Sequence, residues 1–123
     1  QIKFLNLYLH YKVKVFISDR QIFYTIFIYM YNVSTEIYEE TASRLVRAAR
    51  GEEFFSGSIV ARDGEYDLRL TATVIVAYGK QADPNGQRIV EDMIPVWWEF
   101  HTYLGGEEVL NDFSFGDLRV CLR

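Results

Sequence analysis

Apolar residues recur at helical spacing between residues 34 and 50. They sit at i, i+4, i+7 and i+11, which places them on one face of an α-helix. The members of this stripe are Tyr38, Ala42, Leu45 and Ala49. Ser34 is suited to cap the start, and Gly51 is suited to end the helix in a left-handed conformation. Acidic residues early in the segment and arginines late in it complement the helix dipole. The pattern predicts a helix with one buried face.

Alternating apolar and polar residues on both sides of Asp63-Gly64 predict a β-hairpin. A type I′ turn at this dipeptide puts Arg62 opposite Glu65 and sorts apolar from polar side chains onto opposite faces. The inner pairs expected from it are Ala61 with Tyr66, Ile59 with Leu68, Gly57 with Leu70 and Phe55 with Ala72. The centre of the core is expected to hold Leu68, Leu70, Val74 and Val76.

Residues 79–87 are typical of a loop, and Pro95 disturbs the strand that follows, which indicates a bulge or an edge position. Beyond it, one face is expected to carry Val96, Trp98, Phe100 and Leu104. The other face is expected to carry Trp97, Glu99, His101 and Tyr103.

A four-residue loop over residues 105–108 would return the chain along this strand. The pairs expected from it are Leu104 with Val109, Phe100 with Phe113, Trp98 with Phe115 and His101 with Asp112. After a phase shift at Gly116-Asp117, alternation resumes through residue 122, as in an extended segment. The predicted fold class is α+β, with one N-terminal helix packed on a four- to five-stranded antiparallel β-meander.

Residues 1–29 differ in composition from the rest of the chain. No Gly, Ala, Pro or Glu occurs before residue 33, and three of the four lysines fall there. We interpret residues 1–29 as upstream translation, with Met30 as the start of a single domain over residues 30–123. An extra β-hairpin turning at residues 18–20 is the alternative. The uncharged run over residues 21–33 is shorter than the roughly 20 residues of a membrane helix.

Charge and cysteine content narrow the function classes. The formal net charge is −4, and because the first 32 residues carry +3, the remainder carries −7. An acidic body repels phosphate backbones, so nucleic-acid binding would depend on the helix arginines Arg44, Arg47 and Arg50. Cys121 is the single cysteine, which fits a core thiol in a reducing, cytoplasmic setting.

No motif indicates a cofactor. Glycine-rich phosphate loops of the known patterns are absent from the sequence, and no clustered Cys and His residues are spaced as metal ligands. The best catalytic candidate is His101 as a general base held by Asp112, with Glu99 beside it. No serine or cysteine is placed by a motif as the nucleophile, so the sequence favours a non-catalytic protein.

Large aromatic residues on the sheet face opposite the helix are the leading candidates for an interaction surface. Trp97 and Tyr103 are expected to flank His101 there. The alternative is that another element, such as the N-terminal segment, covers them. The sequence favours a small acidic binding domain that contacts a protein partner or a second copy of itself through this face. A small enzyme using His101 is the second hypothesis.

Overall fold

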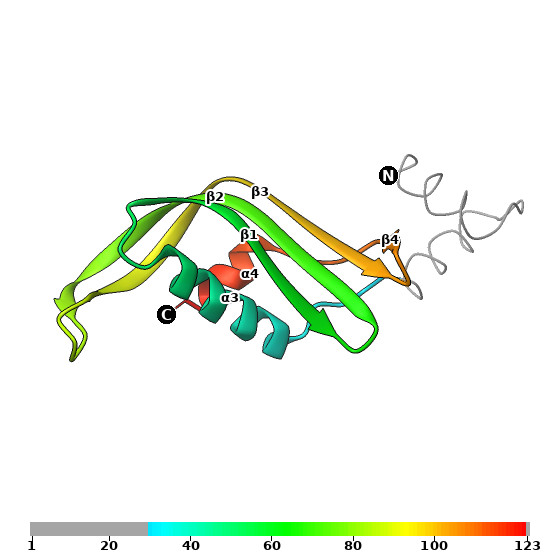
Figure 1. Cartoon of the computed structure of the whole chain (residues 1–123), viewed down its shortest axis with the longest axis horizontal. Helices are drawn as coiled ribbons and strands as arrows, with labels where there is room; N and C mark the ends of the chain where they lie inside the picture. Colours follow the sequence, from blue (N-terminus) through cyan, green and yellow to red (C-terminus); the bar gives the residue numbers. More distant parts are fainter. Residues whose placement is uncertain (1–29, 123) are drawn as a thin grey trace, which may run out of the picture.

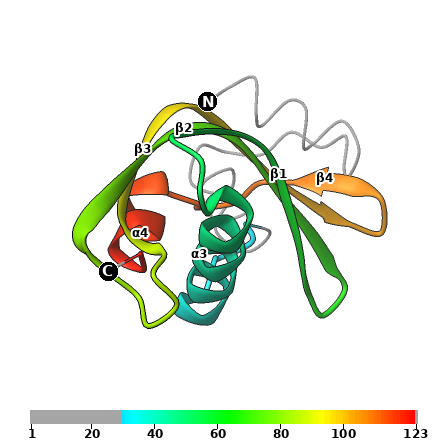
Figure 2. The ribbon, with the colours of Figure 1, turned by 60° about the vertical axis from the view of Figure 1, so that its left-hand side comes forward.

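The computed structural model of the protein describes residues 30–122, and the predictions made for residues 1–29 lie outside this range. Its elements are α3 (Thr35–Ala49), β1 (Phe54–Asp63), β2 (Tyr66–Ala82), β3 (Arg88–Leu104), β4 (Glu107–Val109) and α4 (Phe115–Val120). The four strands form one antiparallel sheet in the order β1-β2-β3-β4. The sheet arches over both helices, which lie against its concave side (Figures 1 and 2). The predicted α+β meander is confirmed.

Helix α3 begins and ends where the sequence indicates. The Ser34 side chain accepts a hydrogen bond from the Ile37 amide at 3.2 Å, and Gly51 follows the helix with φ +86°. The predicted stripe is buried, with Leu45 and Ala49 almost completely removed from solvent. An apolar stripe on a helix is stable in water only when another apolar surface covers it, and the inner face of the sheet provides that surface.

The β1–β2 hairpin has the predicted faces but a different register. Asp63 pairs with Tyr66, so the turn residues are Gly64 and Glu65, and the expected type I′ turn at Asp63-Gly64 is wrong. Gly64 has φ +60°, whereas Glu65 does not have a positive φ, as in a type II′ turn with glycine at its first central position. The cross-strand partners therefore move by two residues. A shift of two conserves the side-chain alternation, so the same residues still face the core.

The long strands β2 and β3 extend beyond the helices as a hairpin (Figure 1). Strand β2 continues to Ala82, so the loop is shorter than the expected 79–87. Near Pro95 the register shifts: Val74 pairs with Pro95 and Thr73 with Trp97, which leaves Val96 without a partner in β2. The predicted bulge is confirmed. Val96 is 59% exposed rather than facing the core, because the bulge interrupts the alternation at this residue.

The chain turns at the end of β3 in two residues, not four. Gly105 and Gly106 both have positive φ, as a type I′ turn requires, and Leu104 pairs with Glu107 instead of Val109. Strand β4 is only three residues long. The chain then leaves β3, forms an isolated parallel bridge between Asn111 and Tyr31, and still stacks Phe113 on Phe100 with ring centroids 4.1 Å apart.

The expected extended segment at the C-terminus is a short helix instead. Ser114 caps α4 by accepting a hydrogen bond from the Asp117 amide, and Leu118 is fully buried. Trp98 lies over the start of this helix, with its ring centroid 6.1 Å from that of Phe115. Arg119 pairs with Asp92 of β3 at 2.6 Å, which attaches α4 to the sheet.

The core lies between the concave face of the sheet and the two helices. All four residues expected at its centre are buried. Tyr31 belongs to it too: its amide donates to the Leu110 carbonyl, and its hydroxyl donates to Asp63 at 2.7 Å. Within residues 30–122, one buried side-chain polar group lacks a hydrogen-bond partner: the hydroxyl of Thr102, whose residue is completely buried.

Candidate functional site

The convex face of the sheet is not covered by α3 or α4 (Figure 2). Residues that point away from the core form cross-strand rows on this open face. From one end to the other, the rows are Phe54–Ile75–Ile94, Ser56–Thr73–Trp97, Ser58–Thr71–Glu99 and Val60–Arg69–His101. The face thus changes from apolar, through hydroxyl-bearing, to charged.

The apolar end forms what we call the outer patch, made of Phe54, Ile75, Ile94 and Trp97. Their exposed fractions are 57%, 44%, 45% and 48%, in that order. Because Phe54 pairs with Ile75 and Ile75 with Ile94, three of the four side chains are direct neighbours across three strands. Contiguous exposed apolar surface of this kind is typical of contact sites, whereas scattered apolar residues are not.

The middle of the open face carries two hydroxyl pairs. Ser56 lies 2.9 Å from Thr73 and Ser58 lies 2.9 Å from Thr71, oxygen to oxygen, across β1 and β2. These groups satisfy one another while they remain exposed. The Ser58–Thr71 pair lies between the outer patch and the charged end.

His101 lies at the charged end between two carboxylates. Its Nδ1 is 2.7 Å from Glu108 and its Nε2 is 3.0 Å from Glu99. The hydrogen bond to Glu108, and then the one to Glu99, raise the pKa of His101, against a smaller opposing effect of burial. A raised pKa leaves a smaller fraction of the imidazole neutral near pH 7, so less of it is available to accept a proton as a general base.

The expected His101–Asp112 pair does not form. The Gly105-Gly106 turn is short and β4 ends at Val109, so Asp112 does not lie in a strand opposite His101. Glu108 is paired with Tyr103, and its side chain reaches His101 from that position. The Asp112 carboxylate instead accepts a hydrogen bond from the Val33 amide at 2.7 Å, at the entry to α3. Of the predicted catalytic group, only His101 and Glu99 are brought together.

The two aromatic residues predicted to form an interface lie in different parts of the open face. Trp97 is half exposed and belongs to the outer patch. Tyr103 lies at the charged end opposite Glu108, with its ring 6.3 Å from that of His101. The remaining outer-patch residues were missed by sequence reasoning. The available sequence signal was side-chain alternation: Ile75 lies between Val74 and Val76 and must point to the opposite face of the sheet. All three residues are apolar, so the sequence does not mark which of them is exposed.

The helix arginines do not act as one row. Arg44 is bound to Glu40 at 2.8 Å and to the Val60 carbonyl, so its guanidinium joins α3 to β1. Arg47 and Arg50 have no such ion pair within residues 30–122. The proposed nucleic-acid surface therefore loses one of its three members to a structural contact.

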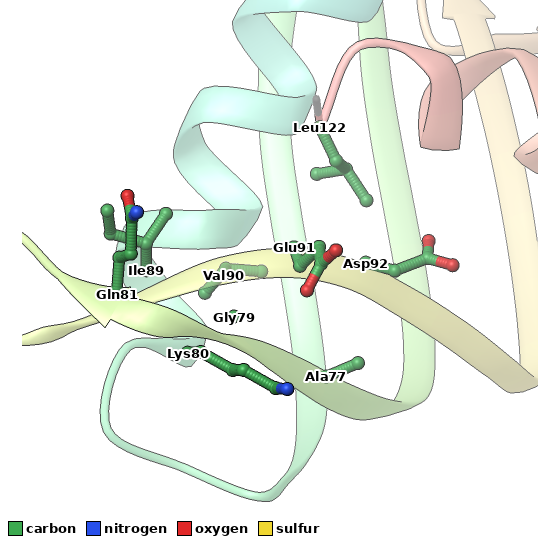
Figure 3. Close-up of a pocket in the computed structure, with 9 residues that line it drawn as sticks. All are labelled: Ala77, Gly79, Lys80, Gln81, Ile89, Val90, Glu91, Asp92 and Leu122. Carbon is green, nitrogen blue, oxygen red and sulfur yellow. The ribbon is translucent and has the colours of Figure 1, made fainter.

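Two hollows lie near the β2–β3 hairpin. The larger, of about 800 Å³, is bordered by both strands and by the chain end after α4. Figure 3 shows Leu122 reaching toward the hairpin, with Lys80 on one strand and Glu91 on the other. The second, of about 520 Å³, lies at the end of α3. His101 lines neither hollow.

Other candidate chemistry is limited within the part of the chain that the structure describes. No group of three or more His, Cys, Asp or Glu side chains there is arranged to hold a metal ion. Cys121 is half buried, and burial, followed by the charges of Glu39 and Asp117, raises its pKa, which disfavours the nucleophilic thiolate. None of the helices in residues 30–122 has the length and apolar character needed to cross a bilayer.

Comparisons of the chain with protein-family models, with curated proteins and with solved structures gave no match.

Proposed function

We propose that this protein works through protein–protein contact on the open face of its sheet, with either a second copy of itself or a different protein as the partner. The observation that carries the proposal is the outer patch. Its four large apolar side chains are each roughly half exposed and gather at one end of a single face. Covering them removes apolar surface from water, which is the main driving force for association.

The other end of the open face favours specificity over affinity. Arg69 carries positive charge there, as does His101 when it is protonated, and Glu99, Glu108 and Asp67 carry negative charge. Charges of both signs select the orientation of a partner and repel a wrong one. A second copy in antiparallel orientation would present the same positive and negative groups, so that opposite charges could face each other. Self-association is therefore tested first.

The test compares substitutions in the outer patch with one elsewhere. Sedimentation equilibrium of the full chain is expected to show association. Trp97→Ala or Ile75→Ser should each weaken it by at least about tenfold, because central aromatic and apolar residues dominate interfaces. Val120→Ser is the matched control, since Val120 is 68% exposed but lies on α4, away from this face.

A monomeric wild-type chain would direct the test to a different partner. Crosslinking in the native cell should then capture a protein with the wild-type chain and lose it with Trp97→Ala, while circular dichroism of the variant stays unchanged. The proposal is wrong if the outer-patch variants self-associate and crosslink to the partner protein as strongly as the wild type does. It is also wrong if the only effect of these substitutions is unfolding.

A further inference from the structure

The smaller hollow lies where the end of α3 meets the tip of the β2–β3 hairpin. Both are on the same side of the molecule in Figure 1. The hollow measures about 520 Å³, within the size range of small-ligand sites. Its lining consists of Arg50, Gly51, Glu53, Tyr78, Gly86, Gln87 and Arg88. Residues far apart in the sequence thus converge on one small space.

Tyr78 holds the two sides of this hollow together. Its hydroxyl donates to the Glu52 carbonyl and lies 3.4 Å from the carbonyl of Ala49, the last residue of α3. Carbonyl groups at a helix C-terminus bear partial negative charge, which disfavours an anion nearby, and the hydroxyl offsets part of this charge by donating to them. The guanidinium of Arg88 also stacks on the ring of Tyr78 in a cation–π contact, with its central carbon 4.3 Å from the ring centroid.

The hairpin tip is itself well braced. Asp83 accepts hydrogen bonds from the Asn85 and Gln87 amides through its carboxylate, at 2.9 and 2.8 Å, and its amide donates to the Gln87 carbonyl at 2.7 Å. These contacts fix the residue that precedes Arg88. Arg88 is therefore positioned both by its own stacking and by the loop that leads to it.

The charges around the hollow are unbalanced. Among residues 30–122, Arg44, Arg62 and Arg119 each have a carboxylate within 4.0 Å. The same part of the chain provides no such ion pair for Arg50 or Arg88. Glu53 lines the hollow, but it is not within ion-pair distance of either. Two arginines face one space in a body that is otherwise strongly acidic.

We propose that this hollow binds a phosphate group, with Arg50 and Arg88 as its two ligands. A guanidinium offers several N–H donors in a planar fork that matches phosphate oxygens, and two of them can share one tetrahedral dianion. Glu53 lines the same hollow but forms no ion pair with Arg50 or Arg88 within residues 30–122, so a bound phosphate would supply the negative charge that these two arginines lack. A carboxylate, with one charge and two oxygens, would satisfy only one guanidinium.

The experiment is an amide NMR titration of the full chain at constant ionic strength. The probes are inorganic phosphate, glycerol 3-phosphate and acetate. We expect both phosphates to shift the amides of Gly51, Gly86 and Gln87 along saturable curves, and acetate to produce much weaker shifts. Tighter binding of glycerol 3-phosphate would identify the ligand as a phosphate monoester, and tighter binding of inorganic phosphate would identify it as the free ion.

Substitutions decide whether the two arginines are the ligands. Arg50→Gln and Arg88→Gln should each weaken phosphate binding by about tenfold or more, because each removes charge-assisted hydrogen bonds. Arg62→Gln is the matched control and should bind as the wild type does, since Arg62 is an exposed arginine on β1. Unchanged amide spectra without ligand would show that the fold is kept.

Two results would overturn the proposal. One is that the amide shifts rise linearly with ligand concentration, are equal for all three probes and occur near every surface arginine. Such shifts would indicate ionic screening and not binding at one site. The other is binding by the Arg50→Gln and Arg88→Gln variants at wild-type strength. Neither result bears on the outer patch, which lies on the convex face of the sheet.

Discussion

The two faces of one sheet differ in what surrounds them although the same strands build both. On the concave face, Leu68, Leu70 and Val74 are buried beneath two helices. On the convex face, Ile75 and its neighbours in the outer patch remain about half exposed. Adjacent residues in one strand therefore have opposite roles. The buried residues of the concave face stabilise the fold, whereas the exposed residues of the convex face are available for contact with another molecule.

The largest difference between the faces should come from one substitution made on each. Leu70→Asp buries a carboxylate among apolar neighbours and is expected to cost at least about 3 kcal/mol, enough to unfold the domain. Ile75→Asp, five residues along the same strand, should change the free energy of unfolding by less than about 1 kcal/mol. Urea unfolding at concentrations where the chain is monomeric measures both. Equal losses would mean that the convex face is also part of the core.

A smaller effect is expected from pH at the charged end of the open face. Because Glu108 and Glu99 raise the pKa of His101 in the folded state, its protonated form stabilises the fold. This stabilisation is fully present below the unfolded pKa of about 6.5 and is lost as pH rises through the higher folded value.

NMR titration of the His101 ring checks this expectation. Glu108→Gln should lower the His101 pKa, and His101→Gln should remove its resonance and so separate it from His10. The pH dependence of unfolding between pH 6 and 8 should become weaker in both variants. An unchanged His101 pKa in Glu108→Gln would show that the 2.7 Å contact is absent in solution.

The smallest effects concern hydroxyl groups on the two faces. The buried Thr102 hydroxyl has no hydrogen-bond partner in the part of the chain that the structure describes. Thr102→Val, which has nearly the same shape, should therefore leave stability unchanged or raise it by up to about 1 kcal/mol. Ser56→Ala on the open face removes a hydrated hydroxyl pair and should cost no more than about 0.5 kcal/mol. Thermal unfolding measures both. A clear loss in Thr102→Val would reveal a partner for its hydroxyl.

The sequence predicted the helix, the faces of the sheet and the core, because these depend on local periodicity. Ser34, Gly51 and the buried stripe of α3 are examples in which capping and spacing agree. It failed where a turn had to be counted exactly. Gly105-Gly106 was expected within a four-residue loop, but the turn has two residues, and His101 bonds Glu108, the residue paired with Tyr103, instead of Asp112.

Other features of the candidate sites had no local signal. The outer patch depends on which strands lie next to one another, and the proposed phosphate site depends on the approach of the hairpin tip to the end of α3. Arg50 and Arg88 are 38 positions apart in the sequence, so no spacing rule relates them. Arg44, a candidate together with Arg47 and Arg50 for nucleic-acid binding, is held by Glu40 and Val60.

The sequence alone determined that one helix would cover one face of an antiparallel meander, because side-chain alternation and helical spacing assign each residue to a face whatever the exact register. The tertiary structure decided which residues on the uncovered face become neighbours, how tightly each turn closes, and that the chain after β4 ends in a helix under the sheet. These outcomes depend on contacts between distant segments, whose geometry is set only when the whole sheet bends around its core.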